Sequence, residues 1–308
     1  MSANTSGELP ITEQENPRTA NLSELAVPDI LRLMNEEDRL VAPAVGNVLT
    51  DIQKAVEGIV DRLSKGGRLF YIGTGTSGRL GVLDAAECPP TFGVAPDLVQ
   101  AVIAGGYEAC YRAVEASEDD AEAGANDLRQ RGFAKDDALV GIAASGRTPY
   151  TVGAVSYARE LGGFTVALTC VPASPITKAV EVSIVAVVGP EVLAGSTRLK
   201  AGSAQKMVLN MLSTATMIRL GYVSGNRMTN LQPRNAKLRE RAARIIMAET
   251  GVAESVAGEK LEAAGGDLRS ALVMSRTGCE LRTAKDALKA SNGVVQKAIE
   301  QLGGQDSN

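Results

Sequence analysis

Apolar and polar positions follow two patterns along the chain, one typical of helices and the other typical of buried strands. Between residues 27 and 65 apolar side chains recur at the spacing of an amphipathic helix, and the glycine pair at 66–67 ends that pattern. Further along, short runs that are apolar throughout are separated by helical stretches. The pattern predicts strands at 68–73, 98–105, 138–144, 164–170 and 182–188, and helices at 78–88, 107–131 with a break, 149–161 and 198–220.

Strands that have no polar face and are separated by helices predict a parallel sheet covered on both sides. The expected fold class is therefore α/β, with a parallel sheet flanked by helices in flavodoxin-like layers. After about residue 235 the pattern changes to short helices joined by glycines, which predicts a small module that packs on the rest or supports a dimer. We expect a polar N-terminal arm over 1–25 lying on a neighbouring surface, an α/β domain over 26–235 and the helical module over 236–308.

The composition excludes several classes of catalysis. The 308 residues include no histidine, so Ser-His-Asp and Cys-His arrangements cannot exist, nor can zinc sites with imidazole ligands. Proton transfer near neutral pH must then come from Glu, Asp, Lys, Tyr or Cys. The four cysteines show no CxxC spacing, which argues against a zinc knuckle or a redox pair. We expect neither a metal nor a cofactor.

Charge and hydropathy limit the partners and the compartment. A formal net charge of -4 gives no reason to expect nucleic acid, so an anionic ligand would be captured by local donors. The polar N-terminus lacks the apolar stretch of a signal peptide, and no uninterrupted run of about 18 apolar residues predicts a membrane span. Together with the low cysteine content, these features predict a cytoplasmic protein without a membrane partner.

A loop rich in glycine and hydroxyl groups, GTGTSG at 73–78, follows the first predicted strand and opens a helix. Glycine lets the backbone approach an anion closely, and a helix N-terminus supplies free N–H groups. The loop also fits the GxGxxG fingerprint of dinucleotide binding, which requires an acid at the end of the next strand. That strand ends in VIAGG, so dinucleotide binding is the weaker alternative. The hydroxyls of Thr74, Thr76 and Ser77 suit a terminal phosphate better.

Two further loops share these features. The loop ASGRT at 144–148 repeats the Ser-Gly-Arg found at 77–79, and GPEVLAGST at 189–197 leads into a long helix. In an open parallel sheet such loops gather at the carboxyl ends of the strands, where ligands bind. Helix capping by Ser or Thr explains any single loop equally well, but three such loops favour a ligand. The predicted contacts to phosphate and substrate are Thr74, Gly75, Thr76, Ser77, Ser145, Gly146, Arg147, Thr148, Glu191, Ser196, Thr197 and Lys206.

Two acidic segments are candidates for acid/base chemistry. Glu87 lies in DAAECPP, where the prolines are expected to end the helix. A carboxylate at that end faces the negative pole of the helix dipole, which favours the protonated form that a general acid needs. The alternative is a solvated surface glutamate. The second segment, AVEASEDD at 113–120, would begin the next helix, and its composition does not choose among Glu115, Glu118 and Asp119.

The residues around these candidates resemble a known family. YIGTGTSGRLGVLDAAECPPTFGV (71–94), GIAASGRTPY (141–150) and VGPEVLAGSTRLKAGSAQKMVLNMLSTATMIRLG (188–221) are similar to the N-acetylmuramic acid 6-phosphate etherases of the sugar-isomerase (SIS) phosphosugar-binding superfamily. The similarity extends from TEQENPRT (12–19) to at least Leu238, and the C-terminal module looks like the family's UBA-like domain. The α/β domain over 26–235 is then a SIS-type catalytic domain.

The resemblance implies a lyase or hydrolase that cleaves the D-lactyl ether of N-acetylmuramic acid 6-phosphate. The products would be N-acetylglucosamine 6-phosphate and D-lactate, in the recycling of cell-wall amino sugars. It also implies a homodimer with shared active sites, and it identifies Glu87 and Glu118 as the two catalytic glutamates. By analogy Glu118 would remove the proton at carbon 2, and Glu87 would protonate lactate and then activate water. A non-catalytic phosphosugar-sensing regulator and an aldose–ketose isomerase of the same fold remain alternatives.

Overall fold

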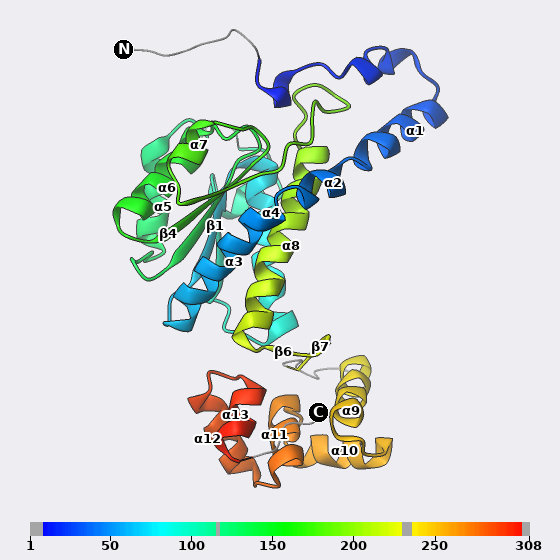
Figure 1. The fold of residues 1–308 in the computed structure, drawn as a ribbon, viewed down its shortest axis with the longest axis vertical. Coiled ribbons are helices and arrows are strands. Elements are labelled where there is room, and N and C mark those ends of the chain that lie inside the picture. Colours follow the sequence, from blue (N-terminus) through cyan, green and yellow to red (C-terminus); the bar gives the residue numbers. More distant parts are fainter. Residues whose placement is uncertain (1–8, 115–117, 230–235, 304–308) are drawn as a thin grey trace. The chain divides into compact units, whose positions relative to one another are not determined.

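The computed structural model describes residues 9–114, 118–229 and 236–303 (Figure 1). These residues form two compact units. The first contains the chain up to Ala85 together with Asp97–Ser213, and the second contains Ala86–Pro96 together with the chain from Thr214 onward. Helices α4 (Gly75–Phe92) and α8 (Lys200–Leu220) each begin in the first unit and end in the second.

Several short helices precede the sheet. Three 3₁₀ turns, η1 (Ile11–Glu13), η2 (Pro17–Thr19) and η3 (Leu22–Glu24), are followed by α1 (Val27–Asp38), α2 (Val41–Gly46) and α3 (Leu49–Ser64). The amphipathic pattern over 27–65 is therefore divided among three helices. Pro43 has no N–H to donate to the carbonyl of residue 39, and Gly46 is a poor helix former, so a continuous helix fails at these places.

Five parallel strands form the sheet of the first unit, in the order β2-β1-β3-β4-β5. Each strand is one to three residues shorter than predicted, because the residues beyond its ladder belong to the adjoining loops. The predicted α/β class, with a parallel sheet flanked by helices, is confirmed. The strands are β1 (Leu69–Gly73), β2 (Val99–Ile103), β3 (Ala138–Ile142), β4 (Phe164–Thr169) and β5 (Val182–Val185).

Helices cover both faces of this sheet (Figure 1). Helices α5 (Ala121–Gln130), α6 (Pro149–Glu160) and the short α7 (Pro175–Lys178) lie on one face, where Phe70 and Ile72 of β1 join their buried cluster. Tyr71 points to the opposite face, because side chains alternate along a strand. There its hydroxyl donates to Asp84 of α4 at 2.9 Å. The connections after β1 and β3 open α4 and α6 at the carboxyl ends of the strands.

Helix α4 continues through Pro89 and Pro90, so the prediction that these prolines end it is wrong. The prolines have no N–H to donate to the carbonyls of Ala85 and Ala86, so the helix passes them without these two bonds, and the N–H of Gly93 closes the last turn on Pro89 O at 2.9 Å. Five residues of the helix follow Glu87. The effect of the helix dipole falls off within the last turn, so Glu87 does not lie at the helix end where the sequence placed it.

The second unit is mainly helical, as predicted for the C-terminal part of the chain. Helices α9 (Ala236–Thr250), α10 (Glu254–Ala263), α11 (Leu268–Thr277), α12 (Leu281–Ala290) and α13 (Val295–Gln301) enclose a cluster of buried Ala, Ile, Leu and Val side chains. A pair of two-residue strands, β6 (Val223–Ser224) and β7 (Arg227–Met228), precedes them. The predicted boundary after residue 235 lies outside the described residues. Among the helices that the structure describes, none combines the length and the apolar run needed to cross a membrane.

Candidate functional site

The loop after β1 opens helix α4 with a backbone conformation that favours glycine. Gly75 has a φ of +49°, where a side chain costs about 1–2 kcal/mol. Thr74 and Thr76 on either side of it are partly buried. Ser77 is buried and donates its hydroxyl to Oε1 of Gln205, on α8, at 3.0 Å. Hydroxyl groups and the first N–H groups of α4 therefore lie together, an arrangement that suits the oxygens of an anion.

Glu118 is brought to this loop by the helix that follows β3. The N–H of Tyr150, in the first turn of α6, donates to the backbone oxygen of Glu118 at 3.1 Å. The side chain of Glu118 reaches the first loop, because a methyl group placed on Gly75 would lie 3.6 Å from Glu118 Oε1. A carboxylate thus lies beside the loop that we predicted to hold the phosphate.

The other acids of this segment differ from Glu118. Glu115 lies outside the described residues, and Asp119 is exposed. Asp120 caps helix α5, where its side chain accepts from the N–H of Ala123 at 3.0 Å. Asp120 therefore has the helix-starting role that the sequence suggested for this acidic cluster. Glu118 is the acid for which the structure shows an approach to the glycine loop.

The second loop, after β3, also requires glycine. Gly146 has a φ of +65°, and a Cβ there would lie 2.1 Å from Oγ of Ser174, so a side chain does not fit. Thr148 is the N-cap residue of α6, yet its side chain makes no capping hydrogen bond. Capping does not account for this threonine, whereas a ligand at the loop would. Ser145 is partly buried and Arg147 is exposed.

Glu191, in the third loop, holds the start of α8, and its contact to the substrate remains a prediction. Its side chain is buried, and its two oxygens accept from the N–H groups of Lys200 and Ala201 at 2.9 Å each. Burial raises the pKa of Glu191, although these two hydrogen bonds and the charge of Lys200 oppose the rise. Because its carboxylate caps α8, the start of that helix is already occupied by an anion. Ser196 and Thr197 remain partly exposed in the same loop.

Asp84 is a buried carboxylate that the sequence alone did not single out. It accepts hydrogen bonds from Nδ2 of Asn210 at 2.7 Å, from the Tyr71 hydroxyl at 2.9 Å and from Oγ of Ser213 at 3.1 Å. Burial raises the pKa of Asp84, while these bonds and then the nearby charge of Lys206 oppose the rise. Asp84 therefore fixes α4 against β1 and α8. Lys206, a predicted ligand residue, is exposed on α8.

Glu87 is exposed on α4, twelve residues after Gly75. It belongs to the second unit, whereas Glu118 belongs to the first. The loops after β1 and β3 and the side chain of Glu118 are thus assembled within one unit. The catalytic role of Glu87 remains a prediction.

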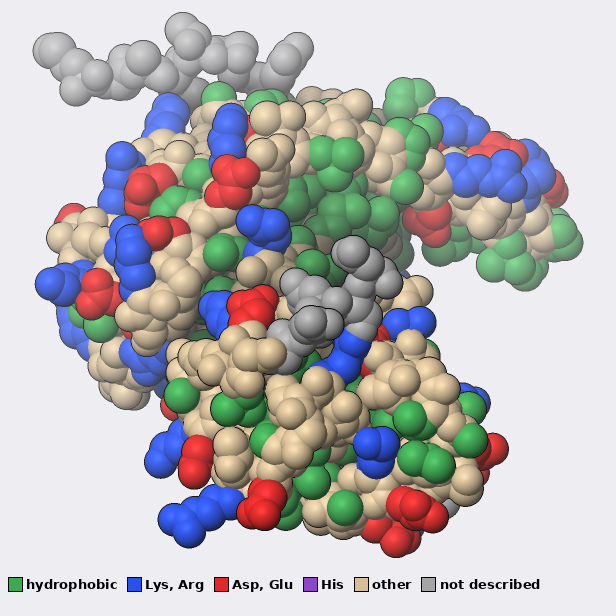
Figure 2. Space-filling view, turned by 60° about the horizontal axis from the view of Figure 1, so that its bottom comes forward, with side chains coloured by type: hydrophobic (Ala, Val, Ile, Leu, Met, Phe, Trp, Pro, Cys, Tyr) green, Lys and Arg blue, Asp and Glu red, His purple; other side chains and the backbone are tan. Residues whose placement is uncertain are grey.

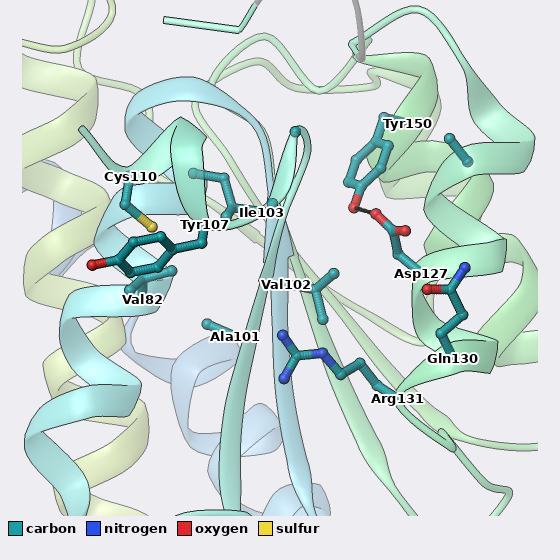
Figure 3. Close-up of a pocket in the computed structure, with 13 residues that line it drawn as sticks. Val82, Ala101, Val102, Ile103, Tyr107, Cys110, Asp127, Gln130, Arg131 and Tyr150 are labelled. Atoms are coloured by element: carbon teal, nitrogen blue, oxygen red, sulfur yellow. Dashed lines mark hydrogen bonds between the residues drawn. The ribbon is translucent and has the colours of Figure 1, made fainter. Parts of the chain in front are cut away.

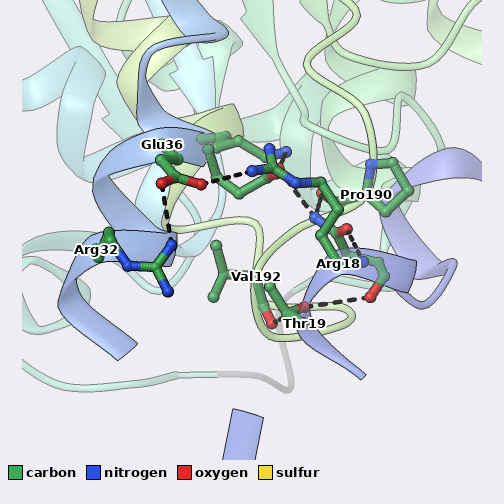
Figure 4. A network of polar contacts seen from close by, with 9 residues as sticks. Arg18, Thr19, Arg32, Glu36, Pro190 and Val192 are labelled. Atoms are coloured by element: carbon green, nitrogen blue, oxygen red, sulfur yellow. Dashed lines mark hydrogen bonds and ion pairs between the residues drawn. The ribbon is translucent and has the colours of Figure 1, made fainter. Parts of the chain in front are cut away.

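The N-terminal segment, which we define as residues 9–25, lies on the third loop (Figure 4). Nδ2 of Asn16 donates to Pro190 O at 3.3 Å, and the hydroxyl of Thr19 donates to Val192 O at 2.9 Å. These bonds hold the backbone of the loop that carries Ser196. No pattern in the sequence predicts these two bonds, since their partners lie more than 170 positions apart.

A cavity of about 540 Å³ lies elsewhere, at the β2 edge of the sheet. Figure 3 shows Tyr107 and Cys110 on one side of the strands, with Asp127, Arg131 and Tyr150 on the other. The Tyr150 hydroxyl donates to Asp127. None of the predicted site residues lines this cavity. It is therefore a feature apart from the loops that carry the candidate site.

Charge is distributed without a dominant sign on the face shown in Figure 2, where acidic and basic side chains are interspersed. An anionic ligand would therefore be held by the local donors of the loops. Across the described ranges, no three His, Cys, Asp or Glu side chains are grouped so that they could hold a metal ion.

Known proteins resemble this chain over most of its length. Two family models match it, "Glucokinase regulatory protein N-terminal SIS domain" over residues 51–159 and "SIS domain" over residues 125–215. The chain is 50% identical over 292 residues to an N-acetylmuramic acid 6-phosphate etherase of Mesorhizobium japonicum, covering 95% of each chain. It is 49% identical over 289 residues to one of Geobacillus thermodenitrificans, covering 94% of this chain and 98% of the relative. A solved phosphoheptose isomerase from Francisella tularensis is 18% identical with a TM-score of 0.49, covering 63% of this chain and 100% of that one.

Proposed function

The chain belongs to the family of N-acetylmuramic acid 6-phosphate etherases, and from this premise we propose which of its residues carry out the family's reaction. The chain is an enzyme that cleaves the lactyl ether of N-acetylmuramic acid 6-phosphate in amino-sugar recycling. The products are N-acetylglucosamine 6-phosphate and D-lactate. The observation that carries the assignment of residues is the position of the Glu118 carboxylate beside Gly75, in a loop suited to an anion.

The phosphate of the substrate binds at the loops after β1 and β3. Thr74, Thr76 and Ser77 supply hydroxyls in the first loop, together with N–H groups of the first turn of α4. Ser145 and Thr148 supply hydroxyls in the second loop, and the uncapped side chain of Thr148 supports this role. Gly75 and Gly146 let the backbone come close to the phosphate oxygens.

Glu118 acts as the base and Glu87 as the acid in an elimination followed by addition of water. In the open-chain sugar the aldehyde acidifies the hydrogen on carbon 2, and the lactyl oxygen on carbon 3 is then a β leaving group. Glu118 takes that proton, a double bond forms between carbons 2 and 3, and Glu87 gives its proton to the departing lactate oxygen. Glu87 next takes a proton from water as the water oxygen adds to carbon 3, and Glu118 returns its proton to carbon 2. Neither step changes an oxidation state overall, so the residues of the chain suffice as proton carriers.

A homodimer explains how Glu87 takes part. Glu87 lies twelve residues along α4 from Gly75, which at 1.5 Å per residue is about 18 Å along the helix axis. A hexose 6-phosphate held at Gly75 is far shorter than this distance. Glu87 therefore serves the substrate bound by a second copy of the chain, and each active site is shared between two subunits. This arrangement is the reason to propose a homodimer.

The function is tested by incubating the protein with N-acetylmuramic acid 6-phosphate and measuring D-lactate. We expect lactate release by the wild-type protein and a loss of about 10²–10⁴-fold in kcat for Glu118→Ala, because positioned acid/base groups contribute that much. Binding of the sugar phosphate without lactate release would instead support a sensor. Interconversion of aldose and ketose phosphates without lactate release would support an isomerase.

We also propose that the enzyme acts in the cytoplasm. All four cysteines are free thiols in the structure, although two of them are only partly buried. Free thiols are typical of proteins in a reducing compartment. The substrate is then a small sugar phosphate that is present inside the cell.

A further inference from the structure

Gln205 of α8 has an unusual hydrogen-bonding arrangement next to the glycine loop. Its side-chain oxygen accepts from the Ser77 hydroxyl at 3.0 Å. The residue is 1% exposed, so water does not reach its amide. Within the part of the chain that the structure describes, its Nε2 has no hydrogen-bond partner. Both N–H bonds of a buried primary amide are thus unsatisfied.

Buried donors without acceptors are rare in folded proteins, because such a donor loses its hydrogen bonds to water and gains none in return. Exceptions call for an explanation such as an absent ligand or a catalytic role. Gln205 lies against Ser77, one of the residues proposed to bind phosphate, and phosphate oxygens are acceptors. Oγ of Ser77 can accept from Nε2 of Gln205 while the Ser77 hydroxyl donates to a phosphate oxygen, so an acceptor for the amide lies within the proposed site.

The hydrogen bond to Gln205 also restricts which other groups the Ser77 hydroxyl can donate to. A serine hydroxyl has one hydrogen, and Ser77 directs it to Gln205. Ser77 therefore cannot donate to a phosphate oxygen while it donates to Gln205. One of the two side chains must change its orientation when phosphate binds.

We propose that Gln205 is a positioning residue that turns the Ser77 hydroxyl toward the phosphate. When phosphate binds, the Gln205 amide rotates by about half a turn about its last torsion, which has broad twofold preferences. Nε2 then donates to Oγ of Ser77, and the Ser77 hydroxyl donates to a phosphate oxygen. One of the two unsatisfied N–H bonds of Gln205 then has an acceptor, while Oε1 gives up the hydrogen bond from Ser77, whose hydroxyl donates to the ligand instead. The inference rests on the proposed phosphate site of the etherase.

Two substitutions of Gln205 distinguish the loss of its hydrogen-bond donor from a change in the volume of its side chain. In Gln205→Glu the carboxylate can accept from Ser77 but cannot donate to it, so we expect KM for N-acetylmuramic acid 6-phosphate to rise at least about tenfold, with kcat changed much less. Gln205→Met keeps the volume without either polar group, and we expect a rise of about three- to tenfold. Gln53→Glu, the same change at an exposed position of α3, is the matched control and should leave KM unchanged.

Thermal unfolding distinguishes a positioning role from a structural one. Without ligand, Gln205→Met should unfold at a temperature equal to or above that of the wild type, because the unsatisfied amide is gone. Added inorganic phosphate should raise the unfolding temperature of the wild type more than that of the variant. If the Ser77–Gln205 bond merely held the fold, the variant would unfold at a lower temperature, and the proposal would be wrong.

A double-mutant cycle provides the last check. If Gln205 acts through Ser77, the KM of Ser77→Ala combined with Gln205→Met should equal that of Ser77→Ala alone. If the increases in KM of the two single variants multiply in the double variant, the proposal is wrong. A KM for Gln205→Glu within twofold of the wild-type value would also overturn it. Absence of lactate release by the wild-type protein would instead refute the proposed function. In that case the phosphate-induced shifts in unfolding temperature still test Gln205.

Discussion

Glu37 and Lys200 form an ion pair with 2.6 Å between carboxylate and ammonium, although their side chains are only 2% and 1% exposed. The pair joins α1 to the first residue of α8, more than 160 positions later in the chain. Asn16 and Arg18 of the N-terminal segment add hydrogen bonds to the same carboxylate at 2.9 and 2.7 Å. The pair therefore ties the N-terminal segment and α1 to the helix that follows the third loop.

Removing one member of the pair should destabilise the protein strongly. We expect Lys200→Met to lower the free energy of unfolding by about 3–5 kcal/mol, because it leaves the carboxylate of Glu37 buried without its cation. The double variant Glu37→Leu with Lys200→Met should lose less, since no buried charge remains. Urea denaturation measures both. Arg32→Ala, which removes only exposed pairs on α1, should cost less than about 1 kcal/mol and serves as the control. Equal losses in all three variants would contradict this interpretation of the pair.

The pair should also make stability depend on pH. Burial alone would raise the pKa of Glu37, but the hydrogen bond and charge of Lys200, then Asn16 and Arg18, outweigh burial and hold the pKa below its usual value. A carboxylate with a lowered folded-state pKa contributes stability above its unfolded pKa, about 4.3, and loses it as the pH falls through the folded value. The stability difference between wild type and Glu37→Gln should therefore be constant near neutral pH and shrink below about pH 4. A difference that grows on acidification would show the opposite sign of shift.

Thr19 should influence substrate binding although it lies outside the loops. Its hydroxyl holds the carbonyl of Val192 at 2.9 Å, in the loop that carries Ser196. We expect Thr19→Val to raise KM severalfold by loosening this loop, whereas Thr19→Ser, which keeps the hydroxyl, should resemble the wild type. Steady-state kinetics of lactate release measures the difference. Identical KM values for the two variants would show that the N-terminal segment does not position the loop.

We predict that Gly75 is required for function, although the neighbouring atoms would leave room for a larger side chain. A Cβ there would have room, since the nearest atom outside the neighbouring residues is Glu118 Oε1 at 3.6 Å. The positive φ nevertheless makes Gly75→Ala unfavourable by about 1–2 kcal/mol, and the methyl group would stand between the loop and a ligand. We expect a folded protein that no longer gains stability from inorganic phosphate. Gly46→Ala, at the end of α2 with open space around it, is the control and should keep that gain.

A mixture of two inactive variants should test the shared active site. If Glu87 serves the substrate of the partner, a dimer of one Glu87→Ala subunit and one Glu118→Ala subunit contains one complete site. After unfolding and refolding of an equimolar mixture, half of the dimers are mixed, so about a quarter of the wild-type activity should return. Neither variant alone should recover activity. If both glutamates act within one subunit, the mixture would stay as inactive as its components.

The hydrophobic pattern determined the fold class. Uninterrupted apolar runs predicted the five parallel strands, because strands covered on both faces cannot keep a polar side. The glycine positions in the first two loops were also visible in the sequence, since Ser-Gly-Arg after an apolar run predicts a turn at a strand end. Helix ends were predicted less well. The prolines at 89 and 90 are included in α4, and the pattern over 27–65 is broken into three helices, because local preferences compete there with packing.

The tertiary structure alone decided which polar groups meet. Composition did not choose among the acids near Glu118. In the fold, the N–H of Tyr150 holds the backbone oxygen of Glu118, and the Glu118 carboxylate lies next to Gly75. The same holds for Ser77 with Gln205 and for Glu37 with Lys200, whose partners are 128 and 163 positions apart. Periodicity along a chain reports which face of an element is buried, because burial depends on local spacing. Hydrogen bonds between distant segments depend on how the elements pack, and a single sequence carries no repeating signal for them.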